Sequence, residues 1–493
     1  MLVFMKQLIF IALIGITLLA CNNTNNSCGQ AYFGGEIINP NNDHVVLYDS
    51  SETPVDTLYL DENNRFTFHL ENLNPGLHSF VHGGESQVVI LEPNDSIMIR
   101  LNTLDFDESL VFTGKGSKKN NYLIELFVKT EDEEKLMYQL SRLEPEEFKT
   151  KVDSIKAIRH TDLNEFISLY PTSNLFKKVA KACIDYNYNA HFEIYPFRHY
   201  NNKEIISYKS LPADFYDYRA YIDYDDEDLK DFYPYYNFLF PHINNLALNE
   251  YFNIIAKKNS VENTTFVFNR QSLDYNLAKL RLIDSLIGSQ SIKNNLLKYS
   301  TRNFLSYNSN TDESEAMYNS FLSKSTNDEH KAYIEKLYAN LNKLRPGNTL
   351  PDVDVVNYAN ETYSIKDLIK KPTVIYFWSN AIKNHFKESH ERVARLKTEY
   401  PNVDFIAINI NSNNASVWKR LLRQNKFPTT NEYRFRNPEA ARKILAIHYI
   451  NKVMVVDGDK TIVSSNAMMF SNEFKELLDL LLSLVGIFLC RPF

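Results

Sequence analysis

Four cysteines, Cys21, Cys28, Cys183 and Cys490, are the residues of this 493-residue chain that could exchange disulfides or bind a soft metal ion. No two of them have the C-x-x-C spacing or another spacing typical of zinc sites, so we expect no metal and no other cofactor. Four cysteines are also too few for a disulfide scaffold in a chain of this length. Cys183 falls on the apolar face of a predicted helix and is interpreted as a core thiol.

Other patterns that carry chemistry are sparse. The sequence has no G-x-G-x-x-G, no P-loop, no H-E-x-x-H and no G-x-S-x-G motif. The acidic run at 223–228 lacks the glycine and the glutamate that a calcium loop needs, so we interpret it as a solvated loop. His385, Glu388 and His390 do not share one helical face, and the favoured interpretation is histidines on a helix surface. A non-local Ser/His/Asp arrangement stays open.

The overall composition limits the class of protein. The formal net charge is −7, and 44% of the residues are hydrophobic. This is an ordinary globular composition, which excludes wholesale disorder. The negative charge argues against a nucleic-acid partner.

The first 20 residues, MLVFMKQLIFIALIGITLLA, have the layout of an export signal. Lys6 gives a positive start, and the apolar stretch from Leu8 to Ala20 is too short for an ordinary membrane span. The boundary LLAC at 18–21 resembles a bacterial lipobox. This resemblance implies a signal peptide over 1–20 and a lipid on Cys21.

The polar residues 21–30 then form a tether to the membrane. By the usual sorting rule for such lipoproteins, Asn22 favours the outer membrane. We therefore expect a protein of the cell envelope that is anchored by lipid and faces the periplasm or the cell surface.

The elements that follow fall into three regions and a tail. Residues 31–115 contain short runs rich in β-branched and aromatic residues, separated by turn signals, and predict a β-sandwich-like domain. The runs are HVVLYD (44–49), RFTFHL (65–70), HSFVHG (78–83), QVVILE (87–92) and SIMIRL (96–101).

Residues 116–343 change to a helical period and predict an α-helical region. Ser173 or Asn174 is the expected N-cap of one helix, and Gly288 the expected end of another. We interpret the aromatic segments 195–200 and 231–240 as loops within this region.

Residues 344–485 alternate strand and helix, which predicts an α/β domain with crossover helices. The expected strands include 373–378 and 403–410, and the expected helices include 382–399 and a closing helix from 471. Residues 486–493 are an apolar tail.

Particular motifs add a family resemblance. The segments GEIINPNNDHVVLYD, DTLYLDENNRFTFHL and FTGKGSKKNNYL resemble a β-rich N-terminal domain of bacterial thioredoxin-like lipoproteins. In the last third, RPG (345–347), LPD (350–352), YSIKDL (363–368) and PTVIYFWS (372–379) resemble the thioredoxin-like domain of the TlpA/ResA type. This resemblance implies a thioredoxin-like fold with a C-x-x-C pair at a helix N-terminus after the strand that ends in Phe-Trp.

This chain departs from that pattern at both functional positions. The aligned tetrad is Ile382, Lys383, Asn384 and His385, so both sulfurs are missing. The position of the family's cis-proline is Asn451. Since a thiolate must attack and a second thiol must resolve the mixed disulfide, ordinary dithiol exchange is not expected here.

Three hypotheses follow. The preferred one is a membrane-anchored binding or structural module, with a protein or peptide partner, built on a redox-inactive thioredoxin-like domain. The alternative is a thiol-disulfide oxidoreductase that uses Cys183 or Cys490. The third is an enzyme of another class, for which the sequence assigns no residues.

Overall fold

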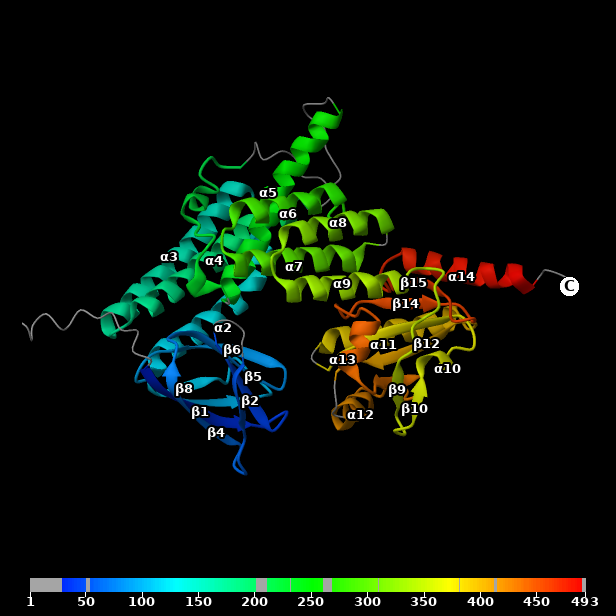
Figure 1. Cartoon of the computed structure of the whole chain (residues 1–493), viewed down its shortest axis with the longest axis horizontal. Helices are drawn as coiled ribbons and strands as arrows, with labels where there is room; N and C mark the ends of the chain where they lie inside the picture. Colours follow the sequence, from blue (N-terminus) through cyan, green and yellow to red (C-terminus); the bar gives the residue numbers. More distant parts are fainter. Residues whose placement is uncertain are drawn as a thin grey trace, which may run out of the picture. The chain divides into compact units, whose positions relative to one another are not determined.

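The computed structural model describes residues 29–49, 54–200, 211–230, 232–259, 268–308, 310–380, 382–411 and 415–489 (Figure 1). The chain forms two compact units. Unit 1 comprises Met1–Asn245 with Thr265–Val267, and unit 2 comprises Leu246–Thr264 with Phe268–Phe493. The predicted signal peptide, the lipidation site Cys21, and Cys28 and Cys490 lie outside the described residues.

Unit 1 begins with two four-stranded sheets, of strand order β4-β1-β7-β8 and β3-β2-β5-β6. The strands are β1 Gly29–Ile38, β2 His44–Tyr48, β3 Pro54–Tyr59, β4 Arg65–Leu73, β5 Gly76–His82, β6 Glu85–Leu91, β7 Ser96–Asn102 and β8 Val111–Lys115. They include all five runs expected from the sequence. The sheets share one apolar core, in which the rings of Phe33 on β1 and Phe80 on β5 have centroids 5.7 Å apart.

Helices complete unit 1. They are α2 Ser117–Leu140, α3 Pro145–Leu169, α4 Asn174–His199, the short 3₁₀ segments η2 Asp217–Tyr221 and η3 Glu227–Leu229, and the first half of α5 Tyr233–Asn259. Ser173 is the N-cap of α4, and its Oγ accepts a hydrogen bond from the backbone N–H of Phe176 at 3.1 Å. A side-chain oxygen in this position satisfies one of the unpaired donors of the first turn.

Two sequence interpretations of this region are wrong. Residues 195–199 and 233–240, which we interpreted as parts of loops, are helical, because α4 continues to His199 and α5 starts at Tyr233. Burial explains the continuation of α4, since Tyr195 and Phe197 lie in the core on either side of Pro196. In α5, Pro234 occupies the second position of the helix, where a missing N–H costs no helical hydrogen bond.

A buried carboxylate joins three elements of unit 1. Glu193 on α4 is fully buried and accepts hydrogen bonds from Arg219 Nε at 2.9 Å, from Tyr218 Oη at 2.8 Å and from Asn245 Nδ2 at 2.7 Å. The Nδ1 of His242 lies 2.7 Å from the same carboxylate. Hydrogen bonding to His242 and the charge of Arg219 lower the pKa of Glu193 despite its burial.

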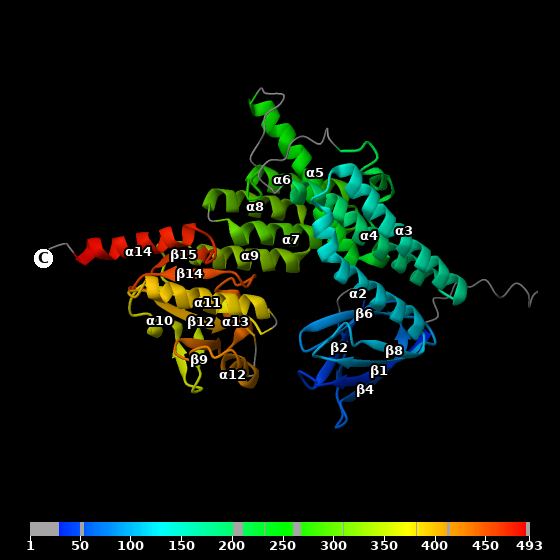
Figure 2. The same cartoon turned by 180° about the vertical axis from the view of Figure 1, so that it is seen from behind.

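Unit 2 contains a layer of antiparallel helices and an α/β domain. The helices that follow α5 are α6 Leu273–Leu286, α7 Gln290–Tyr307, α8 Thr311–Lys324 and α9 Asp328–Lys343, and Figures 1 and 2 both show α7, α8 and α9 side by side. The remaining elements are β9 Asp354–Asn357, β10 Thr362–Ser364, α10 Ile365–Leu368, β11 Thr373–Trp378, α11 Lys383–Glu399, β12 Asp404–Asn409, α12 Ala415–Gln424, β13 Glu432–Phe435, α13 Pro438–Ile444, β14 Val453–Val456, β15 Ile462–Ala467 and α14 Glu473–Leu489.

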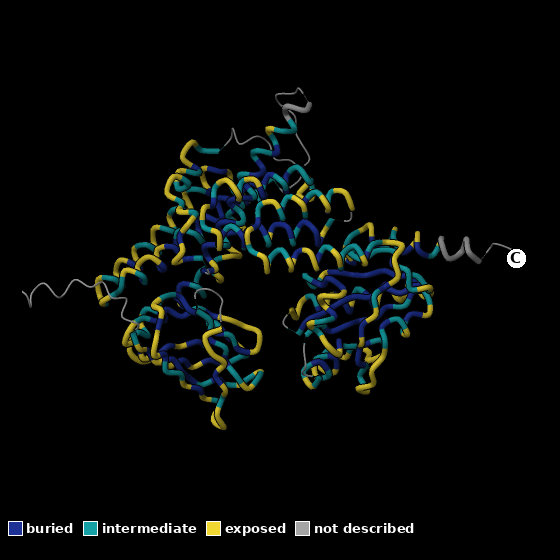
Figure 3. Tube along the Cα trace, in the orientation of Figure 1, coloured by how far each residue is buried: buried dark blue, intermediate teal, exposed yellow. Residues whose placement is uncertain are grey.

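The α/β domain is built on one mixed seven-stranded sheet of order β10-β9-β13-β12-β11-β14-β15. β11 pairs in parallel with β12 and antiparallel with β14, so it lies in the interior of the sheet, paired on both sides. Every residue of β11 is buried, as Figure 3 shows for the central strands. Every second side chain of β11 points to the same face of the sheet, and on this face lie Val374, Tyr376 and Trp378. They pack there with apolar residues of α11, α12 and α14. The predicted α/β pattern is confirmed.

Contacts also tie the helical layer of unit 2 to its sheet. The carbonyl oxygen of Ser306 on α7 accepts hydrogen bonds from Asn466 Nδ2 at 3.1 Å and from Tyr449 Oη at 3.4 Å. The Tyr449 ring stacks on Tyr307 with centroids 4.4 Å apart. The α7 end and the β14–β15 side of the sheet are therefore packed together.

The apolar closing helix α14 continues to Leu489, past the position where we expected a tail. Within the described residues, no helix combines the length and the apolar character that crossing a membrane requires.

Candidate functional site

The tip of α11 holds the four positions at which the family resemblance places its redox pair. Ile382 is the N-cap residue and offers no side-chain hydrogen bond to the helix. Ile382, Lys383 and Asn384 are exposed, whereas His385 is half-buried. The helix N-terminus would stabilise a thiolate at the first position, but the sec-butyl side chain of Ile382 has no ionisable group to stabilise. The α11 tip therefore has the positive end of a helix dipole, as a thiol site would, but no residue at Ile382 that could act as a nucleophile.

His385 is the residue that the family resemblance aligns with the second thiol. Its Nε2 lies 3.3 Å from Ser389 Oγ, and burial lowers the pKa of its imidazole. Its ring lies 6.5 Å from that of Phe470, which follows β15 and is half exposed. The tip and the segment after β15 thus form one surface, which carries aromatic and aliphatic groups in place of sulfur.

Asparagines hold the loop that leads into this tip. The Nδ2 of Asn409 donates to Asn380 Oδ1 at 2.9 Å, and the backbone N–H of Asn380 donates to Asn411 Oδ1 at 2.7 Å. These residues lie where the parallel strands β11 and β12 end, the edge at which α/β sheets commonly carry binding sites. The sequence analysis did not single them out, since their proximity depends on the pairing of the two strands.

Asn451, which the family resemblance aligns with the cis-proline position, lies in the turn before β14. No cis peptide bond occurs among the described residues, so the bonds on both sides of Asn451 are trans. Its neighbour Lys452 is only 2% exposed. The Nζ of Lys452 donates to the carbonyl oxygen of Ala446 at 3.2 Å, and burial lowers the pKa of the amine to about 7.

Within the described residues, the one cysteine is Cys183, which lies on α4 in unit 1. Its side chain is buried, and its Sγ accepts a hydrogen bond from Asn187 Nδ2 at 3.5 Å. Burial raises the pKa of this thiol to about 12, which keeps it protonated at neutral pH. A protonated and inaccessible thiol is a poor nucleophile, in line with its interpretation as a core residue.

A buried acid–base pair lies under the α11 tip. His390 Nε2 is 2.8 Å from Glu432 Oε1 at the start of β13, and His390 Nδ1 is 2.7 Å from the carbonyl oxygen of Phe386. Burial raises the pKa of Glu432, while hydrogen bonding to His390 opposes that shift. The interpretation of His390 as a surface histidine is wrong, because a β13 residue distant in sequence covers it.

A cavity of about 210 Å³ lies in unit 2 next to Lys452. It is lined by residues of α8, the end of α7, the end of α9 with the segment that follows it, the residue before β14, and β15. Its polar lining consists of Ser306, Tyr307, Asn308, Ser314, Tyr338, Asn342, Arg345, Lys452, Ser464, Ser465 and Asn466. This lining is rich in hydrogen-bond donors and contains no carboxylate.

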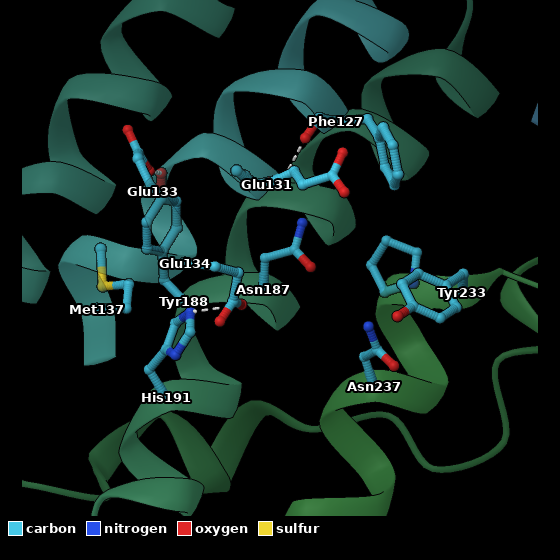
Figure 4. Close-up of a pocket in the computed structure, with 12 residues that line it drawn as sticks. Phe127, Glu131, Glu133, Glu134, Met137, Asn187, Tyr188, His191, Tyr233 and Asn237 are labelled. Atoms are coloured by element: carbon cyan, nitrogen blue, oxygen red, sulfur yellow. Dashed lines mark hydrogen bonds and ion pairs between the residues drawn. The ribbon is translucent and has the colours of Figure 1, made fainter. Parts of the chain in front are cut away.

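Unit 1 has a cavity of opposite character, of about 230 Å³. Figure 4 shows Glu131 and Glu134 of α2 on one side of it, Asn187 of α4 between, and Tyr233 and Asn237 of α5 opposite. Such a lining favours positive charge. In the described part of the chain, however, no three His, Cys, Asp or Glu side chains are arranged to hold a metal ion.

Comparisons with solved structures find thioredoxin-like proteins. The thioredoxin domain of a thiol-disulfide oxidoreductase from Bacteroides vulgatus is 13% identical, with a TM-score of 0.24 over 27% of this chain and 99% of that chain. A thiol:disulfide interchange protein from a Bacteroides species is 14% identical, with a TM-score of 0.23 over 25% of this chain and 81% of that chain. A thioredoxin-like protein from Bacteroides caccae is 13% identical, with a TM-score of 0.31 over 42% of this chain and 78% of that chain.

No protein-family model matches the chain, and no curated protein matches it either.

Proposed function

We propose that this protein is a lipid-anchored component of the bacterial cell envelope, in which a thioredoxin-like domain serves as a binding module and does not exchange disulfides. The sequence motifs between residues 345 and 379 support the fold assignment, together with the alternation of strands and helices around the buried strand β11. The lipobox-like boundary before Cys21 supports the anchor.

The observation that carries the proposal is the chemistry of the α11 tip. Disulfide exchange needs a thiolate that attacks and a second thiol that resolves the mixed disulfide. Ile382 and His385 occupy those two positions, and neither side chain can form a sulfur–sulfur bond. Cys183 is buried, and burial raises the pKa of its thiol, so it is a poor substitute for the missing thiols.

We expect a protein or peptide to bind at the same surface. Ile382 and Phe470 are large apolar side chains that are 45% and 52% exposed, and Phe470 contacts His385 of the tip. These exposed apolar side chains lie near the carboxyl ends of the parallel strands β11 and β12, where α/β sheets commonly bind ligands, and offer apolar contact area to a partner there.

An exchange assay tests the absence of redox activity. The full chain in detergent micelles is incubated with a fluorescent mixed-disulfide substrate, next to an Ile382→Ala/His385→Ala double variant. We expect equal rates, both at the uncatalysed background. Wild-type turnover well above that of the double variant would contradict the proposal.

A gain-of-function variant is the matched positive control. Ile382→Cys/His385→Cys restores two thiols at the positions that the resemblance assigns to them. We expect this variant to form an intramolecular disulfide and to show exchange activity, because the helix N-terminus is already in place.

The anchor is tested separately with Cys21→Ala. We expect the wild-type chain to incorporate radiolabelled fatty acid and to sediment with membranes, and the variant to do neither. A wild-type chain that stays unlabelled would remove the lipid anchor from the proposal and leave the exchange result unaffected.

A further inference from the structure

Lys452 is a buried cation that lacks a counter-charge. It is 2% exposed, and its partner among the described residues is the neutral carbonyl oxygen of Ala446. Of the described carboxylates, none lies within ion-pairing distance of its Nζ, and burial alone accounts for the lowered pKa. A buried ammonium without a carboxylate is costly, and proteins ordinarily pair such a group.

The surroundings of Lys452 are cationic as well. Burial, with smaller contributions from the charges of Arg302, Lys452 and Arg442, lowers the pKa of His448 to about 4. Arg345 lines the same cavity as Lys452 and donates to the hydroxyl of Thr311. In the described ranges, none of these groups has an acidic partner, although the chain as a whole carries a charge of −7.

The cavity beside Lys452 has the size and the donors for a small anion. Its volume is about 210 Å³, and its lining brings Ser464 and Ser465 of β15 together with Arg345 and Lys452. Ser306 also lines it, is 8% exposed, and has a side-chain hydroxyl with no hydrogen-bond partner among the described residues. A guanidinium, an ammonium and several hydroxyls are the donor set that proteins use for carboxylate and phosphate oxygens.

We propose that this cavity is a binding site for a small oxyanion, a carboxylate or phosphate group, held by Lys452 and Arg345 with hydroxyl donors from β15 and α7. The anion supplies the negative charge that the protein itself does not place next to Lys452. The inference goes beyond the proposed function, since it depends on unit 2 alone and not on whether the α11 tip exchanges thiols.

Thermal unfolding of the full chain in detergent tests the site. The midpoint is measured at about pH 6, where the Lys452 amine is mostly protonated, with sodium phosphate in one arm and sodium acetate in the other. Sodium chloride holds the ionic strength constant in every sample. We expect a saturable rise in the midpoint in at least one arm, and the arm that responds identifies the class of anion.

Substitutions then locate the effect. We expect Lys452→Met and Arg345→Gln each to weaken the apparent affinity for the anion about tenfold or more, because each substitution removes one charged hydrogen bond. Lys387→Met removes an exposed lysine on α11 and serves as the matched control, with an unchanged response. Arg345→Gln keeps the test decisive if Lys452→Met does not fold.

The acetylation rate of Lys452 is a second readout, which does not use the unfolding midpoint. Acetylation of Lys452 by acetic anhydride, followed peptide by peptide with mass spectrometry, is expected to slow when the effective anion is present, because the bound anion keeps the amine protonated. The proposal would be overturned if the midpoint shifted equally in wild type, Lys452→Met and Lys387→Met. It would also be overturned if neither phosphate nor acetate gave a saturable shift.

Discussion

The imidazole Nε2 of His390 lies 2.8 Å from Oε1 of Glu432, and both side chains are about 95% buried. The Nδ1 of His390 donates to the carbonyl oxygen of Phe386, because a carbonyl can only accept. A proton is therefore shared between Nε2 and the carboxyl group, either as an ion pair or as a neutral hydrogen bond. Whichever form holds, Nε2 of His390 and Oε1 of Glu432 pair with each other in a buried environment.

Removing His390 should destabilise the protein much more than altering Glu432 conservatively. His390→Leu leaves the Glu432 carboxyl buried without its partner, and we expect a loss of about 3 kcal/mol in the free energy of unfolding. Glu432→Gln retains a hydrogen bond to Nε2 and is expected to cost less than about 1 kcal/mol. Urea unfolding followed by circular dichroism measures both. Equal losses in the two variants would show that the pairing itself contributes little.

Lys452→Met should stabilise the folded chain in a pH-dependent way. The pKa of Lys452 is lowered to about 7 in the folded state, against about 10.4 in the unfolded chain. The unfolded state therefore binds the proton more tightly between these values, and the stability of the wild type rises as the pH increases through this window.

Below about pH 7 the full cost of burying the ammonium remains, so the variant should gain a few kcal/mol there and lose this advantage towards about pH 10. Unfolding free energies are measured in buffers free of phosphate and carboxylate, with Lys387→Met as the control whose difference from wild type is flat. A gain for Lys452→Met that does not change with pH would contradict the assignment.

Cys183 should resist alkylation in the native chain. Its pKa of about 12 leaves few thiolates at about pH 8, and we expect iodoacetamide to react roughly 10³-fold more slowly than with an ordinary thiol of pKa about 8.5. Peptide-level mass spectrometry resolves Cys183 from the other cysteines. Labelling in urea is the control and should be complete. Fast native labelling would revive Cys183 as a reactive residue.

Arg219→Met should disrupt unit 1. The substitution leaves Glu193 buried with its main charge partner removed, and we expect a loss of about 3 to 5 kcal/mol. Thermal unfolding of the full chain measures the effect, and we expect the unfolding temperature of unit 1 to fall. Lys135→Met, an exposed cation on α2, is the matched control and should change stability by less than about 0.5 kcal/mol.

Local patterns predicted the strands and helices of this chain better than they predicted its sites. The runs 65–70, 87–92 and 373–378 are strands because alternation and β-branching act within a few residues, and Ser173 caps α4 through a bond to a residue three positions on. The helical state of Tyr195 depends on burial against other elements, which a local pattern does not show. Tyr233 is exposed and begins α5, where Pro234 fits the first turn of the helix.

The same limit applies to the candidate sites. The sulfur-free tip at 382–385 could be located from a motif, because the motif is contiguous. The burial of His390 depends on Glu432, and that of Lys452 on the packing of β14 against the rest of unit 2, contacts that no periodicity encodes. A lysine next to the Asn451 position was the one available signal, and nothing in the sequence distinguished it from an exposed lysine.

The hydrogen bonds from Tyr449 and Asn466 to Ser306 bear on how the C-terminal region can be produced by itself. A recombinant fragment that starts at residue 344 lacks α7. The Tyr449 hydroxyl and the Asn466 amide then lose their bonds to Ser306, and the cavity at Lys452 loses the part of its lining that α7 supplies. A fragment that starts at 268 keeps that lining. Crystallisation and ligand screening therefore have a rational starting residue well upstream of the first strand of the sheet.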